Sequence, residues 1–208
     1  MRVGIFGGTF DPVHMGHLLL AEQSREQGRL DEVWFVPAAH PPHKDDPSLT
    51  RFEQRVEMLA LALAGNRAFR IDELEKERPG PSYTADTLVE LRRRHPRHDF
   101  YLLIGSDTLN DLPNWYQPAR VLELAGLLVM TRPGAAISTV DSLRARLRLP
   151  EEIPLRLDKV ETPQIDISSS DLRRRAAAGR SLRYFLPRAV ECYIQDKNLY
   201  RREAVGSQ

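Results

Sequence analysis

Two histidines, His14 and His17, stand three residues apart in the stretch GGTFDPVHMGH at positions 7–17. The stretch directly follows the apolar run RVGIF, so a strand is expected to end in the glycine pair and a helix to begin near Val13. Glycines carry no Cβ, which lets the backbone turn tightly and approach a ligand closely. The amides of a helix N-terminus bind phosphate. Two imidazoles beside a polyphosphate can donate hydrogen bonds that offset charge growing in a transition state. The stretch therefore indicates a phosphate site.

Simpler roles for the two histidines stay open at this point. Either could cap the helix or pack against it, and a zinc pair is a further alternative, although no third ligand stands nearby. The glycine pair matches neither the GxGxxG fingerprint nor a Walker A loop, because no GK[ST] follows it. The position of the histidines after a strand and a glycine turn favours phosphate contact over these alternatives.

A second candidate phosphate site lies near the other end of the chain, in ISSSDLR at residues 167–173. Serines at a helix start offer hydroxyls and backbone amides, and the planar guanidinium of Arg173 can pair with phosphate oxygens. Helix capping by Ser168 or Ser169 alone would also explain the serines. Two such stretches at opposite ends of the chain indicate a phosphate site more strongly than either does alone.

Basic side chains in the middle of the chain are candidates for binding a second substrate. HPPHK at residues 40–44 presents His43 and Lys44 after the second expected strand. A basic pair in that position can hold a monophosphate, although charges on a solvent-exposed loop would look the same. Arg132 adds another cation after a later strand, at the edge where ligands are expected.

Two further stretches carry candidate polar and aromatic groups. PSYTADTL places Thr84 where it can cap a helix, which needs no ligand to explain it. LLIGSDTLNDLPNWYQ at residues 102–117 leaves a strand, turns at Gly105 and then presents Asp107 and Trp115. An indole can stack on a flat heterocycle, or it can simply pack against the protein.

The elements that must position these residues alternate along the chain. Apolar runs with little alternation indicate strands covered on both faces, and stretches with helix-like spacing separate them. This repetition predicts an α/β protein with a doubly wound parallel sheet and a small C-terminal helical part, with ligands beyond the carboxyl ends of the strands. Strands are expected at 2–6, 32–36, 68–72, 99–104, 126–131 and 155–158. Helices are expected at 15–27, 51–64, 84–95, 117–124 and 139–147, then in two C-terminal stretches, the first ending at Gly179.

Length and composition narrow the class of protein. The 208 residues fit one domain, 1–202, with a frayed tail at 203–208. A formal net charge of +1 gives no global argument for nucleic-acid binding. Cys192 is the single cysteine, which excludes an internal disulfide and suits a reducing cytosol. No signal peptide is evident, and the longest apolar run, LAGLLVM, is too short to cross a bilayer. We expect a cytoplasmic protein that binds neither nucleic acid nor membrane; homo-oligomerisation stays open.

The two phosphate-site stretches resemble one superfamily. GGTFDPVHMGH resembles the T/HxGH signature of the nucleotidylyltransferases, and ISSSDLR resembles their ISSTxxR motif, with Ser170 in place of threonine. The resemblance implies a Rossmann-like fold and an enzyme that joins an NTP to a phosphorylated partner and releases pyrophosphate. It implies catalytic roles for His14, His17 and Arg173. The ATP-binding residues it implies are Gly7, Gly8, Thr9, Phe10, His14, His17, Gly105, Asp107, Ile167, Ser168, Ser169, Ser170 and Arg173.

The remaining stretches are similar to one branch of that superfamily, the bacterial nicotinate mononucleotide adenylyltransferases. PPHK, SYTxDTL, GxDxxxxLxxW and the C-terminal YIxxxxLY carry the resemblance, which runs from about residue 3 to residue 200. It implies adenylyl transfer from ATP to nicotinate mononucleotide in NAD biosynthesis, with Mg²⁺ bound mainly through the ATP phosphates and no metal-ligating residues. It also implies that Thr84, Trp115 and Tyr116 hold the pyridine ring and its carboxylate. The other substrate contacts it implies are His43, Lys44, Asp107 and Arg132.

Other functions remain as alternatives. Among enzymes, the same chemistry could act on nicotinamide mononucleotide or phosphopantetheine, or could transfer a cytidylyl group. A nucleotide-binding regulator that does not turn over ATP is the alternative outside enzymes, although it has no need of His14, His17 and Arg173. RNA binding is disfavoured, because the chain has no KMSKS stretch and little net charge.

Overall fold

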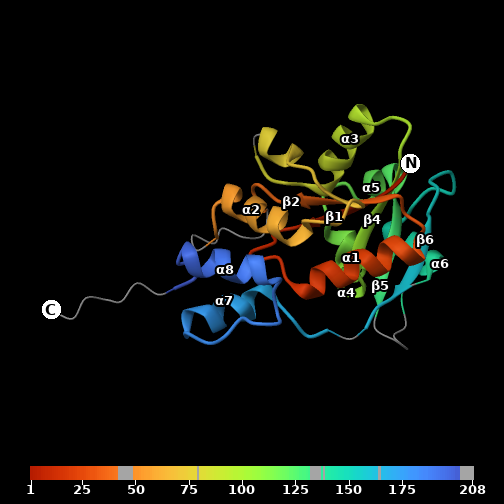
Figure 1. Ribbon diagram of the computed structural model, residues 1–208. Helices are drawn as coiled ribbons and strands as arrows, with labels where there is room; N and C mark the ends of the chain where they lie inside the picture. The colour runs from red at the N-terminus through yellow and green to blue at the C-terminus, as the bar shows by residue number, and fades with distance from the viewer. Residues whose placement is uncertain (42–48, 79, 132–136, 138, 164, 202–208) are drawn as a thin grey trace.

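A six-stranded sheet runs through the middle of the molecule (Figure 1). The computed structural model describes residues 1–41, 49–78, 80–131, 137, 139–163 and 165–201; the expected tail at 203–208 lies outside them. Neighbouring strands are all parallel, in the order β3-β2-β1-β4-β5-β6. The strands are β1 (Arg2–Gly8), β2 (Glu32–Pro37), β3 (Phe69–Ile71), β4 (Asp99–Gly105), β5 (Gly126–Thr131) and β6 (Leu157–Glu161). The predicted doubly wound α/β fold is confirmed.

Helices cover both faces of this sheet (Figure 1). Apolar side chains of α3, α5 and α6 belong to the core on one face, and those of α1, α2, α7 and α8 belong to the core on the other. No helix in the described part of the chain is long and apolar enough to cross a membrane. The helices are α1 (Met15–Gln27), α2 (Phe52–Leu63), α3 (Thr84–Arg94), α4 (Ser106–Asp111), α5 (Pro118–Leu124), α6 (Val140–Leu147), α7 (Ser169–Ala177) and α8 (Arg188–Asp196), with short 3₁₀ turns η1 (Leu74–Glu77) and η2 (Leu112–Asn114).

Successive residues of a strand contribute their side chains alternately to the two cores. In β4, Leu102 and Ile104 point into the core under α3 and α5, whereas Tyr101 and Leu103 point into the core under α1 and α2. Both sets are buried. A strand buried on both faces reads as an unbroken apolar run, which is why the central strands were predictable from sequence.

The strand order reverses between β1 and β4, which lie side by side in parallel register. The chain leaves β1 toward β2 and leaves β4 toward β5, on the opposite side, so the carboxyl ends of these two strands part around a crevice. Gly8 ends β1 and Gly105 ends β4. The fold therefore brings the first glycine turn and the turn at Gly105 to one place.

The last strand lies later than predicted. It spans Leu157–Glu161 rather than 155–158, because this edge strand buries only Val160 and lacks the apolar run that marks a central strand. The side-chain amide of Gln27 pairs with it like a further strand, since its Nε2 donates to the Glu161 carbonyl at 2.8 Å and its Oε1 accepts from the Glu161 amide at 2.9 Å. Covering part of an exposed edge in this way hinders pairing with other chains.

The structure differs from the sequence prediction at one helix and agrees with it at the C-terminal helices. The short helix α4 was not predicted: its six residues bury only Leu109, too little to produce a periodic signal. The C-terminal helices were predicted, and Ser168 caps α7 by accepting a hydrogen bond from the amide of Asp171. Gly179 follows α7 at φ +67°, the left-handed conformation in which helices commonly end.

Candidate active site

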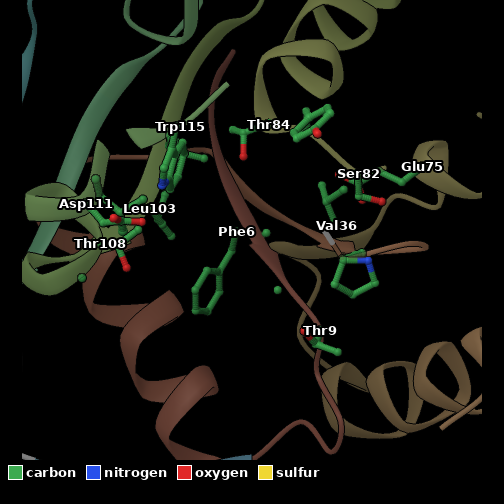
Figure 2. A pocket seen from close by; sticks show the side chains of 18 of the residues that line it. Phe6, Thr9, Val36, Glu75, Ser82, Thr84, Leu103, Thr108, Asp111 and Trp115 are labelled. Carbon is green, nitrogen blue, oxygen red and sulfur yellow. The ribbon is translucent and has the colours of Figure 1, made fainter. Parts of the chain in front are cut away.

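A cavity of about 580 Å³ opens at the carboxyl ends of β1 and β4. Figure 2 shows Trp115 and Asp111 on one side of it and Ser82 and Glu75 on the other, with Phe6 between them. Ligands of doubly wound sheets bind at this kind of position. The predicted site residues that line the cavity are Gly7, Gly8, Thr9, Thr84, Gly105, Trp115 and Tyr116.

The glycine pair at the end of β1 has two separate physical functions. A Cβ on Gly8 would meet the ring of Phe10 at 3.0 to 3.3 Å, so this glycine admits the Phe10 ring beneath the turn. A Cβ on Gly7 would meet no atom within 4 Å, so Gly7 keeps the cavity clear of a side chain. Phe10 itself is only 2% exposed and packs against Phe6, so it supports the turn from inside the core.

His14 and His17 form a reciprocal cap at the start of α1. The helix begins at Met15, where the predicted helix at 15–27 begins, and His14 is its N-cap. The His14 Nδ1 accepts from the backbone amide of His17 at 3.3 Å, and the His17 Nδ1 accepts from the amide of His14 at 3.2 Å. The capping alternative weighed for these histidines is therefore real. It leaves their Nε2 atoms unused by the cap, so capping and phosphate contact are compatible.

The same cap determines where the imidazole protons lie. Burial lowers the pKa of His14 to about 4, and burial together with the adjacent His14 ring holds the pKa of His17 well below its ordinary value. Both rings are therefore neutral at pH 7. Because each Nδ1 accepts a hydrogen bond, the single ring proton belongs on Nε2. The pair thus presents two neutral N–H donors from rings stacked 3.6 Å apart.

Gly16, between the two histidines, leaves room for this stacking because it has no Cβ. A Cβ at position 16 would lie 3.0 Å from the His14 Nδ1 and 3.1 Å from its Cε1, closer than such contacts normally come. Any other residue would push the His14 ring away from the helix start. The spacing of the HMGH motif thus follows from the geometry of the cap.

The serine-rich start of α7 lies against the turn that precedes the histidines. Ser169 Oγ donates to the Pro12 carbonyl at 2.9 Å, and Arg173 Nη1 donates to the Asp11 carbonyl at 2.8 Å. The two stretches proposed from sequence as phosphate sites are therefore neighbours. Ser170 and Arg173 also line a second cavity, of about 520 Å³, together with Tyr200.

Aromatic residues form the other end of the main cavity. Trp115 follows η2 and is half-buried, with its side chain packed in part against the apolar core. Tyr116 is 47% exposed, and its ring stacks on that of Tyr83 with centroids 4.6 Å apart and planes 30° from parallel. Thr84 is the first residue of α3, and Tyr83 rather than Thr84 occupies the cap position. Trp115 thus packs against the core, as one alternative has it, and also lines the cavity, so stacking on a ligand stays a prediction.

The cavity-lining residues that were not proposed from sequence include Glu75, Ser82 and Asp111. Glu75 is 7% exposed, and its Oε1 lies 2.7 Å from the Thr87 hydroxyl. Burial raises the pKa of this carboxyl group above its usual value. In the sequence, Glu75 stands in the charged run ELEKER, which is typical of a solvated surface, so no local signal marks it.

Several predicted residues lie elsewhere. Asp107 is exposed on α4 and does not line the cavity, whereas Thr108 and Asp111 of the same helix do. His17 lies beside the cavity-lining Phe6 and His14 stacks on His17, but neither is in the lining itself. Ile167 is half-buried and packs against the core under α1 and α2. The remaining three substrate contacts lie outside the described residues: His43, Lys44 and Arg132.

Comparison with known proteins defines the class to which this fold and site belong. The chain belongs to the cytidylyltransferase-like family, whose family model matches residues 5–175. Its curated relatives include proteins named probable nicotinate-nucleotide adenylyltransferase. The one from Thermomicrobium roseum is 46% identical over 200 residues, covering 96% of this chain and 92% of the relative. One from Thermus thermophilus is 44% identical over 201 residues, covering 97% of this chain and 100% of the relative. Within the family, the chain thus groups with the nicotinate-nucleotide adenylyltransferases.

A solved structure supports the fold independently. The Plasmodium falciparum nicotinic acid mononucleotide adenylyltransferase complexed with NaAD matches with a TM-score of 0.76. The match covers 96% of this chain and 97% of that one, at 21% sequence identity. At this identity the likeness establishes a shared fold, in agreement with the strand order described above.

We expect acidification to destabilise the fold through His14. Its folded pKa of about 4 lies below the ordinary value of 6.5, so between these values the unfolded chain binds more protons and stability falls as the pH drops. From pH 7 to pH 4.5 the loss from this group amounts to about 2 kcal/mol. Urea unfolding of the wild type and of His14→Asn at both pH values measures it. Asn keeps a helix-capping acceptor but does not titrate, so equal losses in both proteins would contradict the expectation.

Proposed function

We propose that this chain transfers the adenylyl group of ATP to nicotinate mononucleotide, forming deamido-NAD and pyrophosphate. One observation carries the proposal: the helix start with the two histidines, the serine-rich start of α7 and an aromatic-lined cavity all meet at the carboxyl end of the sheet. The names of the sequence relatives agree with it.

The reaction needs positioning and charge neutralisation more than proton transfer. A phosphate oxygen of the mononucleotide attacks the α-phosphorus of ATP, a new P–O bond forms, and the bond from that phosphorus to the bridging oxygen of pyrophosphate breaks. The attacking phosphate is already ionised near neutral pH, so no strong general base is required. Catalysis then depends on holding two anions in line and stabilising the charge on the leaving group.

The groups of this chain suit that task. His14 and His17 offer neutral Nε2–H donors whose orientation is fixed by the cap, so they can donate to phosphate oxygens while each Nδ1 keeps its hydrogen bond in the cap. The amides at the start of α7 and the guanidinium of Arg173 act on the outer phosphates. The backbone at Gly7 and Gly8 lies along the nucleotide, where no Cβ blocks it.

Mg²⁺ belongs to the proposal as an ion that would bind with ATP and would neutralise charge on its phosphates. It normally keeps several water molecules and few protein ligands when phosphates are present. Within the described ranges, no group of three or more His, Cys, Asp or Glu side chains could hold a metal. We infer that the ATP phosphates and water supply most of its ligands.

The acceptor occupies the aromatic end of the cavity in this proposal. The pyridine ring stacks on Trp115 or Tyr116, and its carboxylate lies near Thr84 at the N-terminus of α3, where backbone amides favour a negative charge. The mononucleotide phosphate then points toward Gly7 and the ATP site. His43, Lys44 and Arg132 remain proposed contacts for that phosphate.

Pyrophosphate release tests the proposal directly. With ATP and Mg²⁺, we expect rapid release with nicotinate mononucleotide and little with nicotinamide mononucleotide. Phosphopantetheine and CTP in place of the acceptor and donor complete the comparison. Release with none of these acceptors would overturn the acceptor assignment, and release with the amide alone would move it to the other mononucleotide.

We expect His17→Ala to lower kcat about 100-fold, the usual effect of removing one donor to transition-state charge. His95→Ala is the control, because His95 ends α3 at the opposite, amino end of the sheet. Steady-state pyrophosphate release gives kcat, and thermal unfolding reports how much the lost cap destabilises the fold. A kcat for His17→Ala equal to that of the control would remove His17 from the catalytic machinery.

We expect Trp115→Ala to raise the KM for nicotinate mononucleotide about tenfold and to leave the KM for ATP nearly unchanged, since stacking of an aromatic side chain on a base contributes about 1–3 kcal/mol. Tyr184→Ala, which removes an aromatic ring that is 85% exposed elsewhere, is the control. The two KM values come from titrating each substrate in turn. An unchanged mononucleotide KM would return Trp115 to a purely packing role.

A further inference from the structure

The carboxylate of Asp11 is the centre of a buried set of contacts between the two ends of the chain. Asp11 is only 1% exposed. Its Oδ1 accepts a hydrogen bond from the Tyr200 hydroxyl at 2.5 Å, and its Oδ2 accepts from the backbone amide of Thr50 at 3.2 Å. Arg173 Nη1 lies 4.0 Å from Oδ2 and donates to the Asp11 carbonyl. Asp11 thus holds three segments that are far apart in sequence.

These contacts lie in the turn that carries the proposed catalytic groups. Asp11 follows the glycine turn of β1 and precedes His14 by three residues. Arg55 of α2 is buried and supports the same turn. Its Nη1 donates to the Thr9 carbonyl oxygen at 2.7 Å, and its Nε donates to the Thr50 carbonyl oxygen at 3.0 Å. A shift of Asp11 would therefore move the start of α1 and the guanidinium of Arg173 together.

Tyr200 joins this set from the end of the chain. It follows α8 and has φ +63°, a conformation that costs energy for any residue other than glycine. Burial and the adjacent Asp11 raise the pKa of its hydroxyl far above the ordinary value, so the phenol stays protonated and donates at every working pH. A strained backbone and a half-buried tyrosine whose hydroxyl donates to a buried carboxylate indicate that the geometry of this contact matters.

We propose that Tyr200 is a positioning residue for adenylyl transfer: through the Asp11 carboxylate it holds the turn that sets the histidine pair against Arg173. The inference rests on the proposed function. Tyr200 does not line the main cavity and acts through Asp11, so its effect is on ATP and on turnover rather than on the mononucleotide. None of the motifs considered for the substrates assigns it a role.

The chain itself supplies a matched control in Tyr193. Its hydroxyl donates to Glu57 Oε2 of α2 at 2.6 Å, so it also joins the C-terminal segment to α2 through a tyrosine–carboxylate hydrogen bond. That contact is exposed, in contrast to the buried Asp11 carboxylate. Tyr193→Phe and Tyr200→Phe therefore remove the same chemical group from the same segment, and only the second removes it from Asp11.

The experiment compares the two variants in pyrophosphate release and in direct titration with Mg-ATP without acceptor. For Tyr200→Phe we expect kcat/KM for ATP to fall about tenfold, as for the loss of one hydrogen bond to a charged group, with the mononucleotide KM within twofold of wild type. Tyr193→Phe is expected to keep wild-type values for both substrates. Thermal unfolding of both variants separates loss of fold from loss of positioning.

A double-mutant cycle tests whether Tyr200 acts through Asp11. In the Asp11→Asn background, Tyr200→Phe should have less than a twofold further effect, because the carboxylate that it holds is already gone. ATP parameters of Tyr200→Phe equal to those of Tyr193→Phe would overturn the inference, as would equal losses for both substrates. If the wild type binds Mg-ATP but releases no pyrophosphate, the proposed function fails, and the binding of Mg-ATP to the two variants still decides the role of Tyr200.

Discussion

The attachment of α7 to the turn after β1 is the interaction on which the proposed site depends. The backbone carbonyls of Asp11 and Pro12 lie in a buried turn between a strand and a helix, and buried carbonyls require donors. Arg173 and Ser169 supply them from more than 150 residues away. Because the donors belong to the first turns of α7, satisfying the turn also brings the start of that helix against the segment that precedes the histidines. The same contacts therefore satisfy the buried carbonyls and bring together the two stretches of the proposed anion site.

Neutral donors distinguish this site from one built of cations. His14 and His17 fix each other through backbone amides, and burial keeps both rings uncharged at pH 7. Uncharged donors can be buried together without the repulsion and desolvation that two imidazolium ions would meet. Their donors are also held in place before the ligand arrives, which is the condition for stabilising charge as it develops. In the proposed reaction, the positive charge would come from Arg173 and from Mg²⁺ bound with ATP.

Local signals account for what was predictable. The central strands, the glycine turn and the capped start of α7 all leave a pattern within a few residues, and each was found where expected. Elements with little buried surface leave none: α4 buries one residue, and edge strand β6 was misplaced by two or three. Glu75 was not predicted for a related reason. It stands in a charged run that is typical of a solvated surface, and only the packing of η1 against α3 buries it.

The sequence by itself determined the fold class and the family, and it located the two stretches of the proposed triphosphate site, because glycine turns, apolar runs and motif spacing are local properties of the chain. Only the tertiary structure decided that His14 caps the helix while keeping Nε2 for a ligand, that Tyr200 reaches Asp11, and that Glu75 faces the cavity. Each of these depends on burial or on a contact between distant segments. Such contacts are produced by the packing of helices on the sheet, and no short stretch of sequence encodes them.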